Sequence, residues 1–330
     1  MSTARIVAVP LFLALGCVSA PGVLPAPSPH QAGTFADSVA TANGFLYGTL
    51  IVPTTTRSPV VLLIAGSGPT DRDGNTPLLP GKNNSLRYLA EALAERGIAS
   101  LRYDKRGIGE SRAAVAGLTE ADLRFDHFVD DATTWGRRLA ADRRFSSVVV
   151  IGHSEGSLIG MLAAPAMPAS KVVSIAGAGV PAGDVIIRQL SAQLPPPLLA
   201  QATAAVHRVE RGELLDTVPP GLDALFRPSV QPYLISWFKH DPAVVVSALG
   251  VPLLVVQGTH DIQALEADAR ALAAANPRAR LRLIAGMNHV LKQSPLGRLE
   301  QVPVYSDSTI AIDPTLIDAV SSFVLGGSRP

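Results

Sequence analysis

The sequence has few of the residues that several classes of protein require. It contains one cysteine, Cys17, in 330 residues, so an intramolecular disulfide and a thiolate metal cluster are both excluded. It has no H-E-x-x-H pattern or comparable ligand spacing, and no G-x-G-x-x-G opens a helix after the first expected strand. These absences argue against metal binding and dinucleotide binding, and we expect no cofactor.

Long apolar runs and an excess of one charge are absent as well. No uninterrupted run of about 18 apolar residues occurs, which argues against a multi-pass membrane protein. The 28 Lys and Arg residues are balanced by 27 Asp and Glu residues, without a basic stripe beside aromatic residues. Nucleic acid is therefore not an expected partner. With 47% hydrophobic residues the chain can bury a large core, and one decorated domain is favoured over two.

The first twenty residues have the pattern of an export signal. An arginine precedes the apolar segment 6–15, which has the length of the central region of a signal peptide. The segment ends in Ala14-Leu15-Gly16-Cys17, which resembles a bacterial lipobox. We therefore predict a lipoprotein signal peptide over 1–16, lipid attachment at Cys17, and a membrane-anchored protein in the bacterial cell envelope. The alternative is cleavage after Ala20, which gives a soluble periplasmic or secreted protein.

Apolar strand patterns and helical patterns alternate along most of the remaining chain. Residues 17–40 come first and are predicted to be a flexible tether, because Pro21 to Pro29 is rich in proline, alanine and serine. Asp313 is expected to cap the last helix. Strands are predicted over 45–52, 60–65, 99–103, 148–151, 171–176, 252–257 and 280–284, and helices over 86–98, 128–139, 156–164, 262–275 and 314–323.

The alternation is interrupted between residues 180 and 249. This segment contains Pro195-Pro196-Pro197, Pro219-Pro220 and several weakly amphipathic stretches, which indicate a helical insertion. The predicted core therefore has two parts, 41–179 and 250–326, with the insertion between them. The predicted fold class is α/β, with a mostly parallel central sheet flanked by helices.

A G-x-S-x-G pattern, GHSEG over residues 152–156, stands directly between the strand 148–151 and a short helical stretch. In such a turn the serine takes a strained backbone conformation, and the glycines lack Cβ atoms that would otherwise collide. Ser154 is therefore predicted to be a catalytic nucleophile. The alternative is an ordinary glycine-rich turn between a strand and a helix.

A serine hydroxyl is a weak nucleophile at neutral pH, so it needs a histidine to take its proton and a carboxylate to orient that histidine. Asp261 and His289 each follow one of the last two predicted strands, in the chain order serine, acid, histidine. We predict a triad of Ser154, Asp261 and His289. Glu266 and Asp268 are alternative acids, but they would lie within the following helix.

Acyl transfer also needs backbone N–H donors for the oxyanion of the tetrahedral intermediate. One is the N–H of Glu155, which follows the nucleophile. The second is expected in the loop after strand 60–65, where we favour the N–H of Ser67 and keep that of Gly68 as the alternative. His153, beside the nucleophile, is expected to pack against the site or support it.

The motifs together resemble those of the α/β-hydrolase superfamily, most closely its serine-aminopeptidase-like branch, which includes bacterial short-chain carboxylesterases. The resemblance extends from Gly44 to the C-terminal helix. It implies an α/β-hydrolase fold with a Ser154, Asp261 and His289 triad that acts without a cofactor. It also implies a helical cap formed by residues 180–249, although no motif there matches the family. The matching segments are GSGPTDRDG (66–74), YDKRGIGES (103–111), GHSEG (152–156), GTHD (258–261) and NH (288–289).

The predicted function is hydrolysis of carboxylic esters with short to medium acyl chains through an acyl-enzyme, with a small-molecule ester as the binding partner. An aminopeptidase or a thioesterase would use the same triad. A catalytically inactive binding module anchored in the cell envelope is the alternative from a different class. The sequence leaves the natural substrate and the oligomeric state open.

Overall fold

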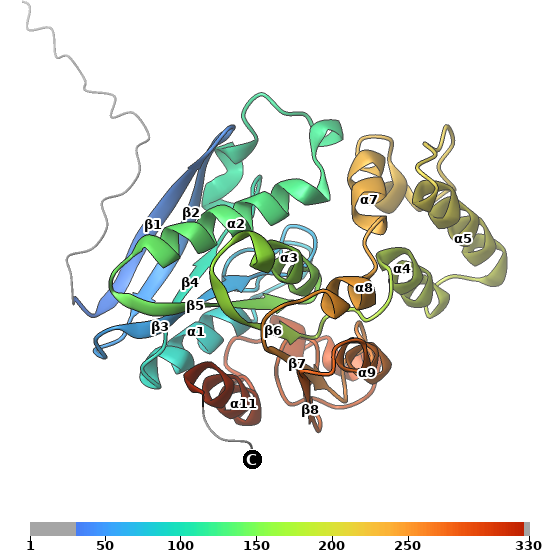
Figure 1. Ribbon diagram of the computed structural model, residues 1–330. Coiled ribbons are helices and arrows are strands. Elements are labelled where there is room, and N and C mark those ends of the chain that lie inside the picture. The colour runs from blue at the N-terminus through green and yellow to red at the C-terminus, as the bar shows by residue number, and fades with distance from the viewer. Residues whose placement is uncertain (1–30, 327–330) are drawn as a thin grey trace, which may run out of the picture.

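The computed structural model describes residues 31–326, which form one eight-stranded sheet with helices on both faces (Figure 1). The strand order is β1-β2-β4-β3-β5-β6-β7-β8. β1 pairs antiparallel with β2, β2 pairs antiparallel with β4, and the remaining neighbours are parallel. The predicted α/β class with a mostly parallel sheet is confirmed.

The strands are β1 (Gly33–Thr41), β2 (Gly44–Val52), β3 (Ser58–Ile64), β4 (Ala99–Tyr103), β5 (Phe145–His153), β6 (Ala169–Ile175), β7 (Leu253–Gly258) and β8 (Ala279–Ile284). The α-helices are α1 (Ser85–Glu95), α2 (Phe125–Ala141), α3 (Glu155–Ala163), α4 (Ala182–Ser191), α5 (Pro196–Glu210), α6 (Asp223–Phe226), α7 (Gln231–Phe238), α8 (Pro242–Ser247), α9 (Glu266–Ala275), α10 (Arg298–Gln301) and α11 (Pro314–Leu325). Short 3-10 helices are η1 (Gly109–Val115), η2 (Glu120–Asp122), η3 (Ala164–Ala166) and η4 (Val304–Ser306).

The central strand β3 is buried on both faces, which explains its continuous apolar sequence. Successive side chains of a strand point to opposite faces of the sheet. Val60, Leu62 and Ile64 therefore join the apolar cluster that includes α2 and α3. Val61 and Leu63 join the cluster on the other face, with α1 and α11 (Figure 1). At the start of α11 the Asp313 carboxylate accepts the N–H of Thr315 at 2.7 Å, so the predicted cap is confirmed.

The tether prediction is wrong at its C-terminal end, because Gly33–Thr41 is strand β1 at the edge of the sheet. Its sequence gives little strand signal, since Asp37 occupies a buried position that a strand pattern would give to an apolar residue. Asp37 is stabilised there by an ion pair with Arg138 of α2. The predicted signal peptide (1–16) and Cys17 lie outside the described residues.

The segment predicted to form a helical insertion contains helices α4 to α8, between β6 and β7. In Figure 1, α4, α5 and α7 lie beyond the end of the sheet. Most of their apolar side chains form a cluster of their own, which includes Val206 of α5 and Leu234 of α7, while Tyr233 and Trp237 of α7 also pack against the sheet cluster that contains α2. The insertion therefore has an apolar core of its own.

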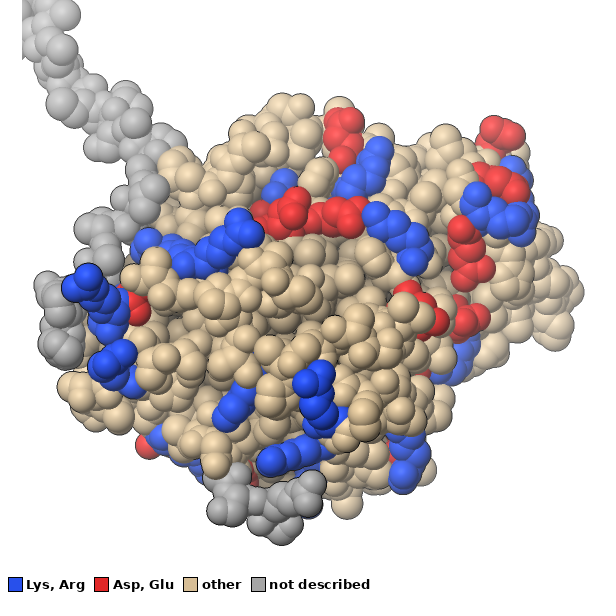
Figure 2. All heavy atoms as spheres, viewed as in Figure 1, with Lys and Arg blue, Asp and Glu red and all other residues tan. Residues whose placement is uncertain are grey.

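Exposed ion pairs join the insertion to the sheet domain. Lys239 pairs with Asp126 of α2 at 2.7 Å, and Arg227 pairs with Glu120 of η2. Figure 2 shows Lys or Arg beside Asp or Glu on the viewed face, with wide areas that carry neither. Exposed pairs of this kind contribute at most about 1 kcal/mol each, so the position of the insertion depends mainly on packing and on buried contacts.

Candidate active site

Ser154 lies at the turn between β5 and α3, with φ 56° and ψ −122°. A non-glycine residue rarely takes a positive φ, and such strain clusters at functional sites. The turn is possible because backbones approach closely there. A Cβ at Gly152 would lie 2.1 Å from the carbonyl oxygen of Gly156, and one at Gly156 would lie 2.3 Å from that of Ile64. The sharp turn that the GHSEG pattern predicts is therefore present.

Asp261 and His289 come together although 28 positions separate them in the chain. Asp261 lies in the loop after β7, His289 in the loop after β8, and both are buried. His289 Nδ1 lies 2.8 Å from Asp261 Oδ2. An ionised carboxylate only accepts hydrogen bonds, so Nδ1 carries the proton and Nε2 keeps its lone pair. A histidine in this tautomer can act as a general base.

The Asp261 carboxylate is held in its ionised form. Burial raises the pKa of this group, but His289 and the backbone N–H groups of Gln263 and Ala264 outweigh that effect and lower the pKa below its usual value. The two N–H groups donate to Oδ1 at 2.7 and 3.0 Å, while Gln257 Nε2 donates to Oδ2 at 3.1 Å. Asp261 therefore keeps the charge that orients an imidazole.

The two alternative acids, Glu266 and Asp268, form ion pairs with other residues. Asp268 is buried in α9 and pairs with Arg188 of α4 at 2.6 Å. Glu266 pairs with Arg270 along the surface of the same helix. Neither contacts His289 in the structure, so Asp261 is the acid that the geometry supports.

His153 connects the turn of Ser154 to the loop of His289. Its Nε2–H donates to the backbone carbonyl of His289 at 2.8 Å, and the two imidazole rings lie 4.8 Å apart between centroids. Burial, with a further contribution from His289, lowers the pKa of His153 to about 3, so the ring stays neutral. The predicted supporting role of His153 agrees with these contacts, and it brings the loop of His289 against the residue that precedes Ser154.

The loop after β3 lies directly beside the turn of Ser154. A Cβ added at Gly66 would lie 3.2 Å from Cβ of Ser154. Ser67 and Gly68, the two predicted sources of the second oxyanion donor, follow it and are exposed. Glu155 is the first residue of α3, where backbone N–H groups have no partner within the helix. Both predicted donor segments therefore border Ser154.

The GHSEG pattern does not predict the contacts of the Glu155 side chain. Its Oε2 is 3.1 Å from Nζ of Lys105, and its Oε1 accepts a hydrogen bond from the hydroxyl of Tyr233 on α7. Lys105 Nζ also donates to the carbonyl of Gly66 at 2.5 Å. Lys105 lies in the segment YDKRGIGES, which matches the family and could have indicated this residue. No sequence pattern indicates Tyr233.

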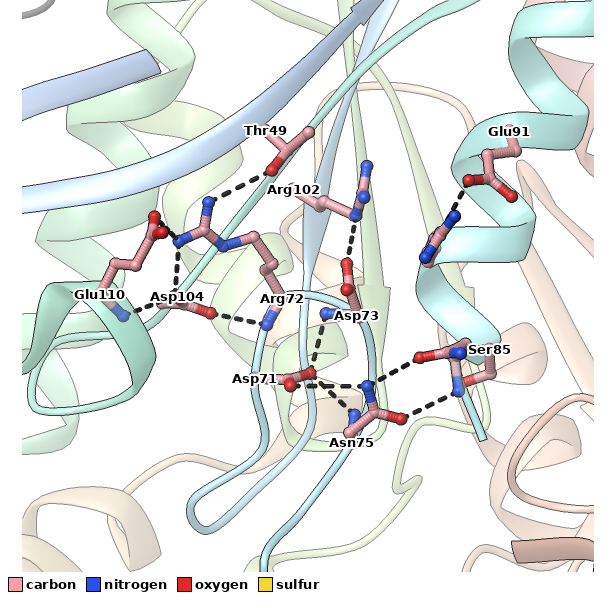
Figure 3. A network of polar contacts seen from close by, with 12 residues as sticks. Thr49, Asp71, Arg72, Asp73, Asn75, Ser85, Glu91, Arg102, Asp104 and Glu110 are labelled. Atoms are coloured by element: carbon pink, nitrogen blue, oxygen red, sulfur yellow. Dashed lines mark hydrogen bonds and ion pairs between the residues drawn. The ribbon is translucent and has the colours of Figure 1, made fainter. Parts of the chain in front are cut away.

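The loops that contain the segments 66–74 and 103–111 are joined by charges (Figure 3). The guanidinium of Arg72 donates to Oδ2 of Asp104 at 2.7 Å and also contacts Glu110, while the backbone N–H of Arg72 donates to Oδ1 of Asp104 at 2.8 Å. Arg102 pairs with Asp73 at 2.7 Å. The loop that carries Ser67 is thereby fixed to β4 and to the turn that follows it.

Among residues 31–326, no three His, Cys, Asp or Glu side chains are grouped to hold a metal ion. No helix in the same range is long and apolar enough to cross a bilayer.

The sheet order, the sharp turn of Ser154 and the loops after β7 and β8 define an α/β-hydrolase fold. The family model described as serine aminopeptidase, S33, matches residues 82–247, half of the chain, and the chain belongs to this family. The resemblance found in the sequence is confirmed.

Individual relatives agree with this assignment. Esterase EstD of Thermotoga maritima is 28% identical over 236 residues, which cover 71% of this chain and 54% of the relative. The chain thus spans about half the length of the curated relative it matches. Est1E from Butyrivibrio proteoclasticus has a TM-score of 0.58 at 18% identity, with 88% of this chain and 98% of that chain covered. A proline iminopeptidase of Mycobacterium smegmatis has a TM-score of 0.57 at 15% identity, with the same coverage. These two structures are similar in fold.

Proposed function

We propose that the protein is a serine hydrolase that cleaves carboxylic esters with short to medium acyl chains. The observation that carries the proposal is the buried His289 and Asp261 pair, which His153 holds against the strained turn of Ser154. A strained serine, and a histidine whose Nδ1 is held by a carboxylate in a neighbouring loop, are the groups that acyl transfer requires. The similarity to a protein named an esterase supports the ester as substrate.

In the proposed reaction, Nε2 of His289 takes the hydroxyl proton of Ser154 as its oxygen attacks the ester carbonyl. Asp261 stabilises the imidazolium that forms. The backbone N–H groups of Glu155 and Ser67 bind the oxyanion, and collapse of the intermediate expels the alcohol and leaves an acyl-enzyme. Water then attacks the acyl-enzyme with His289 again as the base, and the acid is released.

The test uses the wild-type protein, the Ser154→Ala variant and a matched control, Ser157→Ala. Ser157 lies in α3 three positions after the nucleophile and its hydroxyl bonds to Ser174 at 2.6 Å, so the control removes a neighbouring hydroxyl. We expect p-nitrophenyl butyrate hydrolysis and covalent labelling by a fluorophosphonate probe in the wild type and in Ser157→Ala. Ser154→Ala should lose both. Labelling of Ser154→Ala at the wild-type rate would refute the nucleophile assignment.

An aminopeptidase is the second candidate, because the matched family is described as a serine aminopeptidase. The two activities share the acylation chemistry and differ in the leaving group. A panel of p-nitrophenyl esters, thioesters and amino-acid p-nitroanilides separates esterase, thioesterase and peptidase by their kcat/KM values. A preference for the anilides would replace the ester proposal.

Lipid attachment at Cys17 and a place in the cell envelope are proposals that rest on the lipobox-like segment alone. Incorporation of labelled palmitate into the wild type, and its loss in Cys17→Ser, would support them. A wild-type protein that incorporates no label and is released as soluble material would favour cleavage after Ala20.

A further inference from the structure

Lys105 is a buried ammonium between the two segments that border Ser154. It follows the end of β4, and its side chain is 4% exposed. Its Nζ contacts the carbonyl of Gly66 at 2.5 Å and the carboxylate of Glu155 at 3.1 Å, and it lies 5.6 Å from the centre of the Phe128 ring. Burying a charged group costs free energy, so a buried lysine at this place suggests a function for its contacts.

The contact with Gly66 fixes the direction of the Ser67 N–H. A trans peptide unit is planar, so the C=O of Gly66 and the N–H of Ser67 belong to one rigid group and point in opposite directions. An ammonium that binds this carbonyl on one side therefore holds the N–H toward the other side. Gly66 itself lies beside Ser154, as the close approach of their Cβ positions shows.

The contact of Lys105 with the Glu155 side chain helps to position the second oxyanion donor, the backbone N–H of Glu155. Glu155 supplies a backbone N–H at the start of α3, and the carboxylate of the same residue is held by Lys105. The Lys105 ammonium therefore binds both the peptide unit that contains the Ser67 N–H and the side chain of Glu155, the two residues that supply the oxyanion donors. It also neutralises a buried negative charge next to the place where an oxyanion would form.

Tyr233 connects this pair to the insertion. It lies on α7, and its hydroxyl donates to the oxygen of Glu155 that Lys105 does not hold. Burial and the neighbouring Glu155 carboxylate raise the pKa of Tyr233 well above its usual value, so the hydroxyl stays protonated as a donor. The Tyr233 ring packs edge to face against Phe128 at 5.8 Å. A shift of α7 would therefore change the position of Glu155.

We propose that Lys105 and Glu155 form a positioning pair for the oxyanion hole, and that Tyr233 makes this pair sensitive to the position of the insertion. The inference rests on the proposed function and adds to it residues that touch neither the substrate nor the reacting atoms. Their effect passes through the backbone N–H groups of Ser67 and Glu155.

The first test is Lys105→Met, with Lys171→Met as the matched control. Lys171 also donates from Nζ to backbone carbonyls, at 2.7 and 2.9 Å, and lies 5.5 Å from a phenylalanine ring, but it anchors α11. Removing an oxyanion donor lowers kcat by about 100- to 1,000-fold, so displacing one should cost about 10- to 100-fold. We expect this loss in kcat, with KM little changed, for Lys105→Met and not for Lys171→Met.

Two further readouts separate positioning from loss of structure. The fraction of protein that a fluorophosphonate labels at completion counts intact sites, and kcat is expressed per labelled site. A trifluoromethyl ketone forms a serine hemiketal with an oxyanion, so its Ki should rise in Lys105→Met by a factor similar to the loss in kcat. Wild-type kcat per labelled site, or an unchanged Ki, would overturn the proposal. A wild type that neither labels nor hydrolyses any ester of the panel would instead overturn the proposed function and this inference with it.

Tyr233→Phe tests the link to the insertion. It removes only the hydroxyl and keeps the ring, so it remains a usable test if Lys105→Met does not fold. Its control is Tyr103→Phe, because the hydroxyl of Tyr103 is buried and finds no hydrogen-bond partner among the described residues. We expect Tyr233→Phe to lower kcat less than Lys105→Met and to raise the Ki of the ketone in proportion. Tyr103→Phe should change neither. Equal kinetics in the two tyrosine variants would remove Tyr233 from the proposal.

Discussion

Replacing Asp261 with asparagine should abolish base catalysis without changing the shape of the site. The Oδ1 of Asp261 accepts two backbone N–H groups at 2.7 and 3.0 Å, so an asparagine must place its carbonyl oxygen there. The amide NH2 then faces Nδ1 of His289, where Oδ2 accepted a hydrogen bond at 2.8 Å. Two donors cannot face each other, so the imidazole must move its proton to Nε2 and can no longer act as a base.

The expected loss follows from the tautomer. A triad histidine forced into the wrong tautomer loses about 10⁴-fold in kcat, or roughly 5.5 kcal/mol of transition-state stabilisation. The assay is the kcat of p-nitrophenyl butyrate hydrolysis per folded molecule, with thermal unfolding followed in parallel. Asp268→Asn is the matched control, because Asp268 is equally buried but pairs with Arg188. It should lose stability and keep its kcat. More than a tenth of the wild-type kcat in Asp261→Asn would refute the reasoning, and a collapse of kcat in Asp268→Asn would point to the wrong acid.

Two further predictions concern stability. His153 stays neutral in the folded protein down to about pH 3, whereas the unfolded chain gains a proton near the usual pKa of 6.5, so the free energy of unfolding should fall as the pH decreases between those values. His153→Gln should flatten this acid slope by up to about 1.4 kcal/mol per pH unit, measured by urea unfolding at several pH values, and an unchanged slope would contradict the assignment. Asp104→Ala leaves the largely buried Arg72 without its main partner and should cost about 3 to 5 kcal/mol in urea unfolding. Glu91→Ala, which removes an exposed pair with Arg87, should cost less than about 1 kcal/mol, and similar losses in both variants would show that the pair of Arg72 with Asp104 adds no special stability.

The proposed triad could be predicted because its members directly follow apolar strands. The carboxyl ends of parallel strands meet at one edge of a sheet, so Ser154, Asp261 and His289 were expected to converge before any contact was known. The contact between Asp261 and His289 agrees with that expectation. Local sequence identifies these strands and their ends, since continuous apolar runs mark β5 and β7, and alternating apolar residues mark β8.

Features that depend on distant contacts could not be predicted in this way. The edge strand β1 gives a weak pattern because Asp37 is stabilised by Arg138, about a hundred positions later in the chain. Helix α9 begins at Glu266, four positions after the predicted start, because Asp261 binds the N–H groups of Gln263 and Ala264 and keeps that segment in the loop. The contact of Tyr233 with Glu155 depends on how the insertion packs, which no local pattern encodes.

The apolar core of the insertion affects which substitutions this protein can tolerate. Helix α5 buries Ala202, Val206 and Val209 in the cluster of the insertion, away from the sheet. Altered side chains on α5 would first meet neighbouring helices of the insertion and not the sheet that carries Ser154 and His289. Random libraries confined to α5 should therefore yield mostly folded proteins, whereas Arg188 of α4 must be kept because it pairs with the buried Asp268 of α9.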